Sequence, residues 1–443
     1  MSNGSVRLEM PCGTPPLIIS TRRTARGTGA KAGRKLRGPA LVMVLIALVL
    51  GSSAIRARVE DAWVPSWTAS LYEVEPEARL TDEQLTDATL RQAVRLSVGG
   101  DRIRLVLSNA AGDRPLAISG VHVALSGSQG TASIDPQSDR EVDFGGRPDV
   151  EVPAGGDSVS DAVNLRVPPL ARLSISMYFA TPPTIQTGHL RSLSSSWLGH
   201  GNQLAAATIS SAVSIEHWYQ LSAVQVEASK VRTIVAFGDS ITDGSGSTVN
   251  GNNRWPDLLA ERLQASPVTN RWAVSNQGLA GNRLLAEGRG PRALARFEHD
   301  ALSQPHVRTV VLLEGINDLG HLAKTTPQPA ARRAIVRQII GAYRQIVARA
   351  HAHRVRVIGV TLLPFIGSDY LPTPSDEPSR RAINEWIRTP GHFDAVFDWD
   401  AVVRDPGNPS RFSQEFDSGD HLHPSQSGYR AMVDSVPMAE IVK

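Results

Sequence analysis

Short apolar runs alternate with amphipathic segments through the second half of the chain. Residues 233–237 form an apolar segment bounded by polar residues, which is typical of a buried strand. Residues 328–351 place apolar side chains at helical spacings of three, four and seven. The alternation continues with a helical pattern at 255–263 and strand-like runs at 307–313, 355–362 and 394–398. This order predicts an α/β fold in which helices join parallel strands.

The first half of the chain follows a period of two instead. Residues 94–98 and 102–107 alternate apolar and polar positions on either side of Gly99-Gly100-Asp101, which predicts a β-hairpin. Similar alternation recurs, and only residues 82–91 suggest a helix; the further alternating segments are 121–125 and 173–179. Many short strands predict a β-sandwich of jelly-roll type over residues 55–229. We expect the junction with an α/β domain, residues 230–443, at Ala228-Ser229-Lys230.

Polar clusters occur at four points in the α/β half. The first is Gly238-Asp239-Ser240-Ile241, directly after the predicted strand at 233–237. A serine at a strand-to-helix junction can point into a cleft beside helix-end N–H groups. The other clusters, in chain order, are the glycine-rich residues 276–282, then Gly315-Ile316-Asn317-Asp318, then Asp420-His421-Leu422-His423-Pro424. Ligand sites in open α/β sheets gather at strand ends, so we expect a functional site there.

In type, order and approximate spacing, these four clusters resemble the sequence blocks of the SGNH (GDSL-type) serine hydrolases, over residues 230–443. The resemblance implies a flavodoxin-like α/β domain and an ester hydrolase. A serine hydroxyl needs a neighbouring base to become a nucleophile. The resemblance assigns Ser240 as that nucleophile, His423 as the base, and Asp420 as the carboxylate that holds the histidine tautomer.

The resemblance also implies an oxyanion hole, a set of donors aimed at the charge that develops on the attacked ester. Carried over, the donors are the N–H of Ser240, the N–H of Gly281 and the side chain of Asn317. Gly281 suits this role because a residue without a side chain allows close backbone approach. Gly278 is the competing glycine in the same cluster.

Other polar residues near these clusters have simpler interpretations. His421 and His423 with Asp420 could bind a metal, but no second ligand cluster accompanies them, so we predict no metal and no cofactor. We expect Asp239 and Asp318 to hydrogen-bond turn backbone. Two further carboxylates could be read as a glycosidase pair, but a structural or capping role is the better interpretation; they are Asp398 and Asp400.

The charge of the chain is concentrated at its beginning. The 443 residues carry a net charge of +3, but residues 1–37 hold eight Lys or Arg and one Glu, a net of +7. Residues 38–54 are uncharged, so residues 55–443 carry −4, and nothing indicates nucleic-acid binding. A basic segment, an apolar run at 40–50 and small residues predict a signal peptide at 1–54, with a membrane anchor as the alternative. We therefore expect an exported or surface-anchored protein whose single cysteine, Cys12, lies in the leader.

The predicted sandwich allows three roles. It could bind carbohydrate through exposed aromatic residues, or those residues could form its core; the candidates are Trp63, Trp67, Trp197 and Trp218. Alternatively, a loop at 198–202 could lean over the active site. Large aromatic residues in sandwiches are more often core.

The sequence thus predicts an exported serine esterase that acts on small acyl esters, with carbohydrate O-acetyl groups favoured over lipids because no long apolar lid segment occurs in 230–443. One alternative is a lysophospholipase, lipase or thioesterase with the same catalytic residues. The other is a noncatalytic glycan-binding surface protein, against which the four intact clusters argue.

Overall fold

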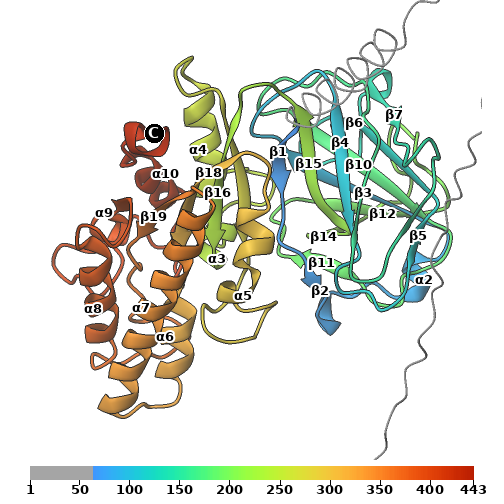
Figure 1. The fold of residues 1–443 in the computed structure, drawn as a ribbon. Helices are drawn as coiled ribbons and strands as arrows, with labels where there is room; N and C mark the ends of the chain where they lie inside the picture. The colour runs from blue at the N-terminus through green and yellow to red at the C-terminus, as the bar shows by residue number, and fades with distance from the viewer. Residues whose placement is uncertain (1–62) are drawn as a thin grey trace, which may run out of the picture. The chain divides into compact units, whose positions relative to one another are not determined.

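The computed structural model describes residues 63–443 (Figure 1). The predicted leader and Cys12 lie outside the described residues, so its interpretation as a signal peptide or an anchor stays a prediction. Among the helices within 63–443, none combines the length and apolar character needed to cross a membrane.

A five-stranded parallel sheet organises the second half of the chain. Its strand order is β17-β16-β18-β19-β20, and all four pairings are parallel. In chain order this is 2-1-3-4-5, the flavodoxin-like arrangement, so the α/β prediction is confirmed. The strands are β16 (Arg232–Gly238), β17 (Trp272–Gly278), β18 (Val307–Leu313), β19 (Arg356–Val360) and β20 (Ala395–Phe397).

Helices follow these strands and pack against the sheet in two groups (Figure 1). One group contains α4 (Trp255–Gln264), α9 (Trp399–Val403) and α10 (Gln426–Asp434); the other contains α5 (Ala293–Phe297), α6 (Ile316–Ala323), α7 (Pro329–Ala352) and α8 (Glu377–Arg388). The short α3 (Ser240–Asp243) follows β16, and α11 (Met438–Ile441) ends the chain. The predicted helices at 255–263 and 328–351 correspond to α4 and α7.

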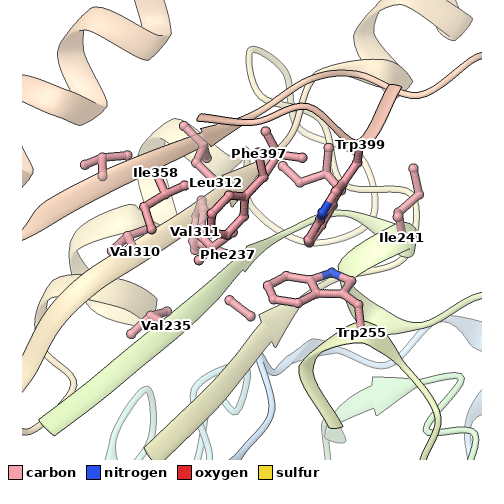
Figure 2. Close-up of a cluster of buried hydrophobic side chains, with 14 of the residues drawn as sticks. Val235, Phe237, Ile241, Trp255, Val310, Val311, Leu312, Ile358, Phe397 and Trp399 are labelled. Carbon is pink, nitrogen blue, oxygen red and sulfur yellow. The ribbon is translucent and has the colours of Figure 1, made fainter. Parts of the chain in front are cut away.

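The core beneath these helices explains why the strand segments are continuously apolar. Phe237, Val311 and Ile358 are fully buried and come from three adjacent strands (Figure 2). Trp255 of α4 meets Trp399 of α9 edge to face, with ring centroids 5.1 Å apart. Burial on both faces of a parallel sheet selects such uninterrupted apolar runs.

The first half of the described chain is mostly antiparallel sheet. A four-stranded sheet comprises β1 (Trp63–Thr68), β15 (Leu221–Glu227), β4 (Ile103–Ser108) and β9 (Asp157–Val159). A six-stranded sheet comprises β13 (Val213–Ile215), β12 (Ser196–His200), β3 (Ala88–Arg95), β10 (Arg172–Phe179), β6 (Gly120–Leu125) and β7 (Arg140–Glu141). Smaller sheets contain β14 (His217–Tyr219), β11 (Thr187–Leu190) and β2 (Tyr72–Glu73), and β5 (Leu116–Ile118) with β8 (Val150–Val152). Both large sheets contribute to one hydrophobic core.

Two sequence predictions in this region are wrong. The expected hairpin at 94–107 does not form, because β3 pairs with β10 and β12 whereas β4 pairs with β15 and β9. Period-two alternation is the same for a hairpin and for two strands that lie in different sheets. The helical pattern at 82–91 gives only α2 (Asp82–Leu85), after which β3 begins at Ala88.

The antiparallel region packs directly against the edge strand of the parallel sheet. Thr68 of β1 hydrogen-bonds the Ser275 hydroxyl at 2.8 Å and donates to the Asn276 carbonyl at 2.9 Å, both in β17. Ala273 of β17 belongs to the hydrophobic core of the antiparallel region. The two regions therefore share buried surface; the domain boundary at 229–230 stays a prediction.

Candidate active site

The parallel register brings three of the four clusters to one edge of the sheet. Gly238 at the end of β16 is paired with Gly278 of β17 and with Leu313 of β18. The chain continues from these strand ends into Ser240, Gly281 and Asn317 respectively. Strand order changes direction at β16, so Ser240 lies at the switch point where open α/β sheets bind ligands.

Ser240 is the first residue of α3. Asp239 caps this helix by accepting a hydrogen bond from the Ile241 N–H at 3.0 Å. The sharp turn exposes the Ser240 hydroxyl to the cleft, although the residue is otherwise buried. Its Oγ lies 2.8 Å from Nε2 of His423, 183 positions later in the chain.

The other ring nitrogen of His423 is fixed by Asp420. Nδ1 of His423 lies 2.6 Å from Oδ2 of Asp420. Burial alone would raise the pKa of Asp420, but the hydrogen bond and the charge of His423, with the N–H groups of Leu422 and His423, hold that pKa well below its usual range. An ionised Asp420 requires a proton on Nδ1, which leaves Nε2 free to accept the serine proton.

The two glycines that are candidates for an oxyanion donor, Gly278 and Gly281, differ in their surroundings. The Gly278 N–H donates to the Asn276 side chain at 2.9 Å, and a Cβ at Gly278 would lie 2.2 Å from the backbone nitrogen of Asp243. Gly281 lines the cleft with a φ of 76°, a conformation that favours glycine. Among the described residues, the N–H groups of Ser240 and Gly281 have no hydrogen-bond partner. This geometry favours Gly281 over Gly278.

Asn317 is held at both ends of its amide. Its Nδ2 donates to the Asn282 carbonyl at 2.7 Å, and its Oδ1 accepts from the Tyr370 hydroxyl at 2.7 Å. One N–H of the amide remains available to the cleft, which Asn317 also lines. Tyr370 was not predicted from the sequence, because it lies within the long connection between β19 and α8 and belongs to none of the four clusters.

A buried arginine joins the loops beneath the site. Arg296 of α5 donates to the Gly238 carbonyl at 2.9 Å and to the Asn282 side chain at 2.9 Å. It also pairs with Glu314 at 3.3 Å. Burial raises the pKa of Glu314 well above its usual value. No motif marks Arg296, since its partners come from several separate segments of the chain.

Asp239 and Asp318 hydrogen-bond backbone, as the sequence predicts. The carboxylate of Asp318 accepts from the N–H groups of Leu284 and Leu285 at 2.7 and 3.0 Å. Burial nevertheless raises the pKa of Asp318 to about 6. These bonds hold the segment that follows the glycine-rich cluster.

The remaining polar residues have structural contacts. His421 hydrogen-bonds Asp417 at 2.6 Å. Asp398 caps α9 through the Ala401 N–H, and Asp400 pairs with Arg380 at 2.5 Å, as expected for structural carboxylates. Within residues 63–443, no group of three or more His, Cys, Asp or Glu side chains is arranged to hold a metal ion.

The strand-end residues line a cleft with a volume of about 580 Å³. Both regions of the chain form its walls, because Arg191 comes from the connection between β11 and β12. The other charged or aromatic side chains that line it, besides Asp420 and His423, are Arg289, His321, Lys324, Asp369 and Tyr370. The cleft therefore carries charged side chains of both signs.

The structure decides between the alternatives for the antiparallel region. The four tryptophans are buried, as the favoured interpretation expects, and Trp67 packs edge to face on Trp218. Residues 198–202 do not line the cleft, since Leu198–His200 belong to β12 and pair with β3. Arg191, in the preceding connection, reaches the site instead.

Comparison with known proteins identifies the class. Residues 236–431 match the model of the GDSL-like Lipase/Acylhydrolase family, so this part of the chain is a GDSL-like lipase/acylhydrolase domain. The match supports a carboxylic ester hydrolase. No curated protein matches the chain.

Solved structures with similar coordinates cover about half of the chain. A lipolytic protein of the G-D-S-L family from Desulfitobacterium hafniense is 21% identical and covers 48% of this chain and 99% of its own, with a TM-score of 0.35. A GDSL-like lipase from Bacteroides thetaiotaomicron is 17% identical over 47% of this chain and 88% of its own, with a TM-score of 0.35. An acetylxylan esterase from Geobacillus stearothermophilus is 19% identical and covers 48% of this chain and 94% of its own, with a TM-score of 0.35.

Proposed function

We propose that this protein hydrolyses carboxylic esters with Ser240 as nucleophile, His423 as general base and Asp420 as the group that orients the histidine. The observation that carries the proposal is the hydrogen-bonded chain from Ser240 Oγ to His423 Nε2, at 2.8 Å, and from His423 Nδ1 to Asp420, at 2.6 Å. All three residues line one cleft.

The reaction follows from these contacts. Ser240 Oγ attacks the ester carbonyl carbon while its proton passes to His423 Nε2. When the tetrahedral intermediate collapses, the alcohol leaves with that proton and the acyl group stays on Ser240. Water then attacks the acyl-enzyme by the same route, which releases the acid and restores the serine. The ionised Asp420 stabilises the imidazolium that forms in each step.

We assign the oxyanion hole to the N–H groups of Ser240 and Gly281 and the side chain of Asn317. The two N–H groups have no partner among the described residues, and all three residues line the cleft. Donors held in place before the reaction stabilise the oxyanion without reorganisation. Tyr370 and Asn282 hold the Asn317 amide in this way.

The preferred substrate in this proposal is a small acyl ester of a polar alcohol, including carbohydrate O-acetyl esters. Cationic, acidic and aromatic side chains share the cleft walls, which suits a hydroxyl-rich alcohol better than an alkyl chain. Export through the predicted leader would bring the enzyme to extracellular substrates.

A lipid-directed activity is the second candidate, because one observation favours it. A neighbouring cavity of about 570 Å³ shares Gly288 with the catalytic cleft. Its lining includes Leu71, Tyr72, Val74 and Pro76, which could accept an acyl chain. Aryl esters from acetyl to long-chain, tested beside acetylated xylan, separate the two: we expect turnover to fall as the acyl chain lengthens. A rise with chain length would favour the lipid-directed enzyme.

Substitution of the proposed catalytic residues tests the mechanism. Because serine and histidine act as one unit, Ser240→Ala and His423→Ala should each lower kcat by about 10⁴-fold or more, and the double variant little further. Asp420→Asn should also be severely impaired. His421→Ala is the matched control, since His421 lies in the same loop but hydrogen-bonds Asp417, and it should stay near wild type. Near-normal turnover in Ser240→Ala would reject the proposal.

A further inference from the structure

His189 is a buried histidine that the antiparallel region presents to the hydrolase domain. It lies on β11, and its side chain is only 2% exposed. Its Nδ1 lies 2.9 Å from the Ser70 carbonyl oxygen, and its Nε2 lies 2.8 Å from Oδ1 of Asp243. The ring also packs beside Trp218 at a centroid distance of 5.5 Å.

Both nitrogens of His189 face oxygen acceptors. The contact between Nε2 and the Asp243 carboxylate joins a side chain of the antiparallel region to a side chain of α3. Such a bond in a buried site fixes both side chains, because a lost partner would leave a polar group without compensation.

Asp243 transmits this constraint to the proposed oxyanion hole. It ends α3, the helix that begins at Ser240. Its second oxygen, Oδ2, accepts a hydrogen bond from the Ala280 N–H at 3.1 Å. Ala280 immediately precedes Gly281, and Asn282 on the other side is held by Arg296 at 2.9 Å. Both chain neighbours of Gly281 are therefore held by buried hydrogen bonds, Ala280 by Asp243 and Asn282 by Arg296.

We propose that His189 is a positioning residue that orients the Gly281 N–H through Asp243 and Ala280, so that the antiparallel region completes the active site. The inference rests on the proposed function, since it presumes that Gly281 stabilises the oxyanion. It gives this region a role in catalysis that needs no contact with the substrate. A displacement of about 1 Å at a catalytic group can lower turnover by about 10²-fold, so a remote hydrogen bond is sufficient to matter.

Substitutions at His189 test the relay in the full chain. His189→Phe removes both ring nitrogens and keeps a ring; we expect kcat on an aryl acetate to fall by about 10- to 100-fold with little change in KM. His189→Gln can still donate to Asp243 and should recover part of that loss. Inhibition by a boronic acid, which mimics the tetrahedral intermediate, should weaken in proportion to kcat in both variants.

A second histidine provides the matched control. His122 of β6 pairs with Asp139 at 2.9 Å within the antiparallel region and does not line the catalytic cleft. His122→Phe should therefore keep kcat and boronic acid inhibition near wild type, even where both substitutions lower Tm. Equal kcat losses in His122→Phe and His189→Phe would mean that the loss comes from general destabilisation. That result would overturn the proposed relay from His189 through Asp243 and Ala280 to Gly281.

The outcomes separate the relay from the proposed function. Wild-type kcat and inhibition in folded His189→Phe, with Ser240→Ala inactive, would reject the relay alone. An active Ser240→Ala would reject the proposed function instead. Should His189→Phe not fold, Asp243→Asn is measured in its place, because it keeps the size of the side chain but replaces one acceptor oxygen with a donor. Unchanged kcat in Asp243→Asn would equally reject the relay.

Discussion

Asp239 is a fully buried carboxylate directly before Ser240, and only one of its oxygens is hydrogen-bonded. Oδ1 accepts from the Ile241 N–H, whereas Oδ2 has no partner among the described residues. Burial raises the pKa of Asp239 to about 7, although the Ile241 N–H and the charge of His423 act in the opposite direction. Capping α3 requires only one oxygen of Asp239. A negative charge on this buried carboxylate therefore lowers the stability of the folded protein at neutral pH.

This shift predicts a pH-dependent stability. Between an ordinary value near 3.8 and about 7, the folded protein holds a proton on Asp239 that the unfolded chain has lost. The contribution of Asp239 to stability is therefore complete at low pH and is lost as pH rises through about 7. Asp239→Asn keeps a capping oxygen without the charge. It should raise the free energy of unfolding by roughly 2–4 kcal/mol at pH 8 and by little at pH 4, since one pKa unit corresponds to about 1.4 kcal/mol.

Denaturant unfolding of both proteins at several pH values measures this difference. Asp135→Asn is the control, because Asp135 is an exposed carboxylate that also caps a short turn, through the Gln137 N–H. Its effect should not depend on pH in the same way. A constant difference between Asp239→Asn and wild type from pH 4 to pH 8 would mean that Asp239 does not change protonation in this range.

At the level of elements, the site joins the ends of β16, β17 and β18 to a connection after β19. Asn317 lies in the first turn of α6, but its orientation depends on Tyr370 in that connection. Asn317→Ala should lower kcat by about 10²- to 10³-fold with KM and Tm largely unchanged, because it removes one proposed oxyanion donor. Tyr370→Phe keeps the ring and loses only the hydroxyl, so it should give a smaller loss in kcat.

Steady-state kinetics with melting curves checks both variants. Should Asn317→Ala melt much earlier and lose folded protein in proportion to activity, Asn317 would be a structural residue. Tyr343→Phe gives a comparison for Tyr370→Phe, since the Tyr343 hydroxyl also donates to buried hydrogen-bonding partners, here the Glu314 carbonyl at 2.6 Å. It should affect stability more than kcat, because Tyr343 does not line the cleft.

The same elements show what could be predicted from the sequence. β18 begins and ends at the predicted residues because its side chains are buried apart from Arg308 and form an apolar run. β17 was not predicted as a strand, because it contains Ser275 and Gln277. Those polar side chains are satisfied by Thr68 and Ser70, more than 200 residues earlier in the chain. The prediction of strand pairing in the antiparallel region was wrong for a similar reason, because the paired strands are distant in the sequence.

Site prediction divides in the same way. Ser240, Asp420, His423 and Asn317 lie within local motifs, and the structure brings them to one cleft. Tyr370, Arg296 and His189 belong to no motif, because their hydrogen-bond partners are distant in the sequence. A short sequence block can specify a reacting group, whereas the groups that hold it depend on the completed fold.

For the whole molecule, these contacts predict that the two regions unfold together. β17 is the edge strand of the parallel sheet, and β1 covers it through Thr68, while Ser97 accepts the Val274 N–H at 3.1 Å. A chain that begins at Val231 would expose this edge and leave Asp243 without His189. Exposed strand edges promote aggregation, and buried charges without partners destabilise.

We therefore expect the truncated protein to be poorly soluble and at most weakly active, even on an aryl acetate whose binding needs no accessory module. A chain that begins at Trp63 and keeps the antiparallel region is the control and should retain full activity. Solubility, Tm and kcat of the two proteins decide the matter. A soluble Val231 protein with full activity on the aryl acetate would show that the antiparallel region is an independent module. It would also argue against a role for His189, because that histidine would be absent from an intact active site.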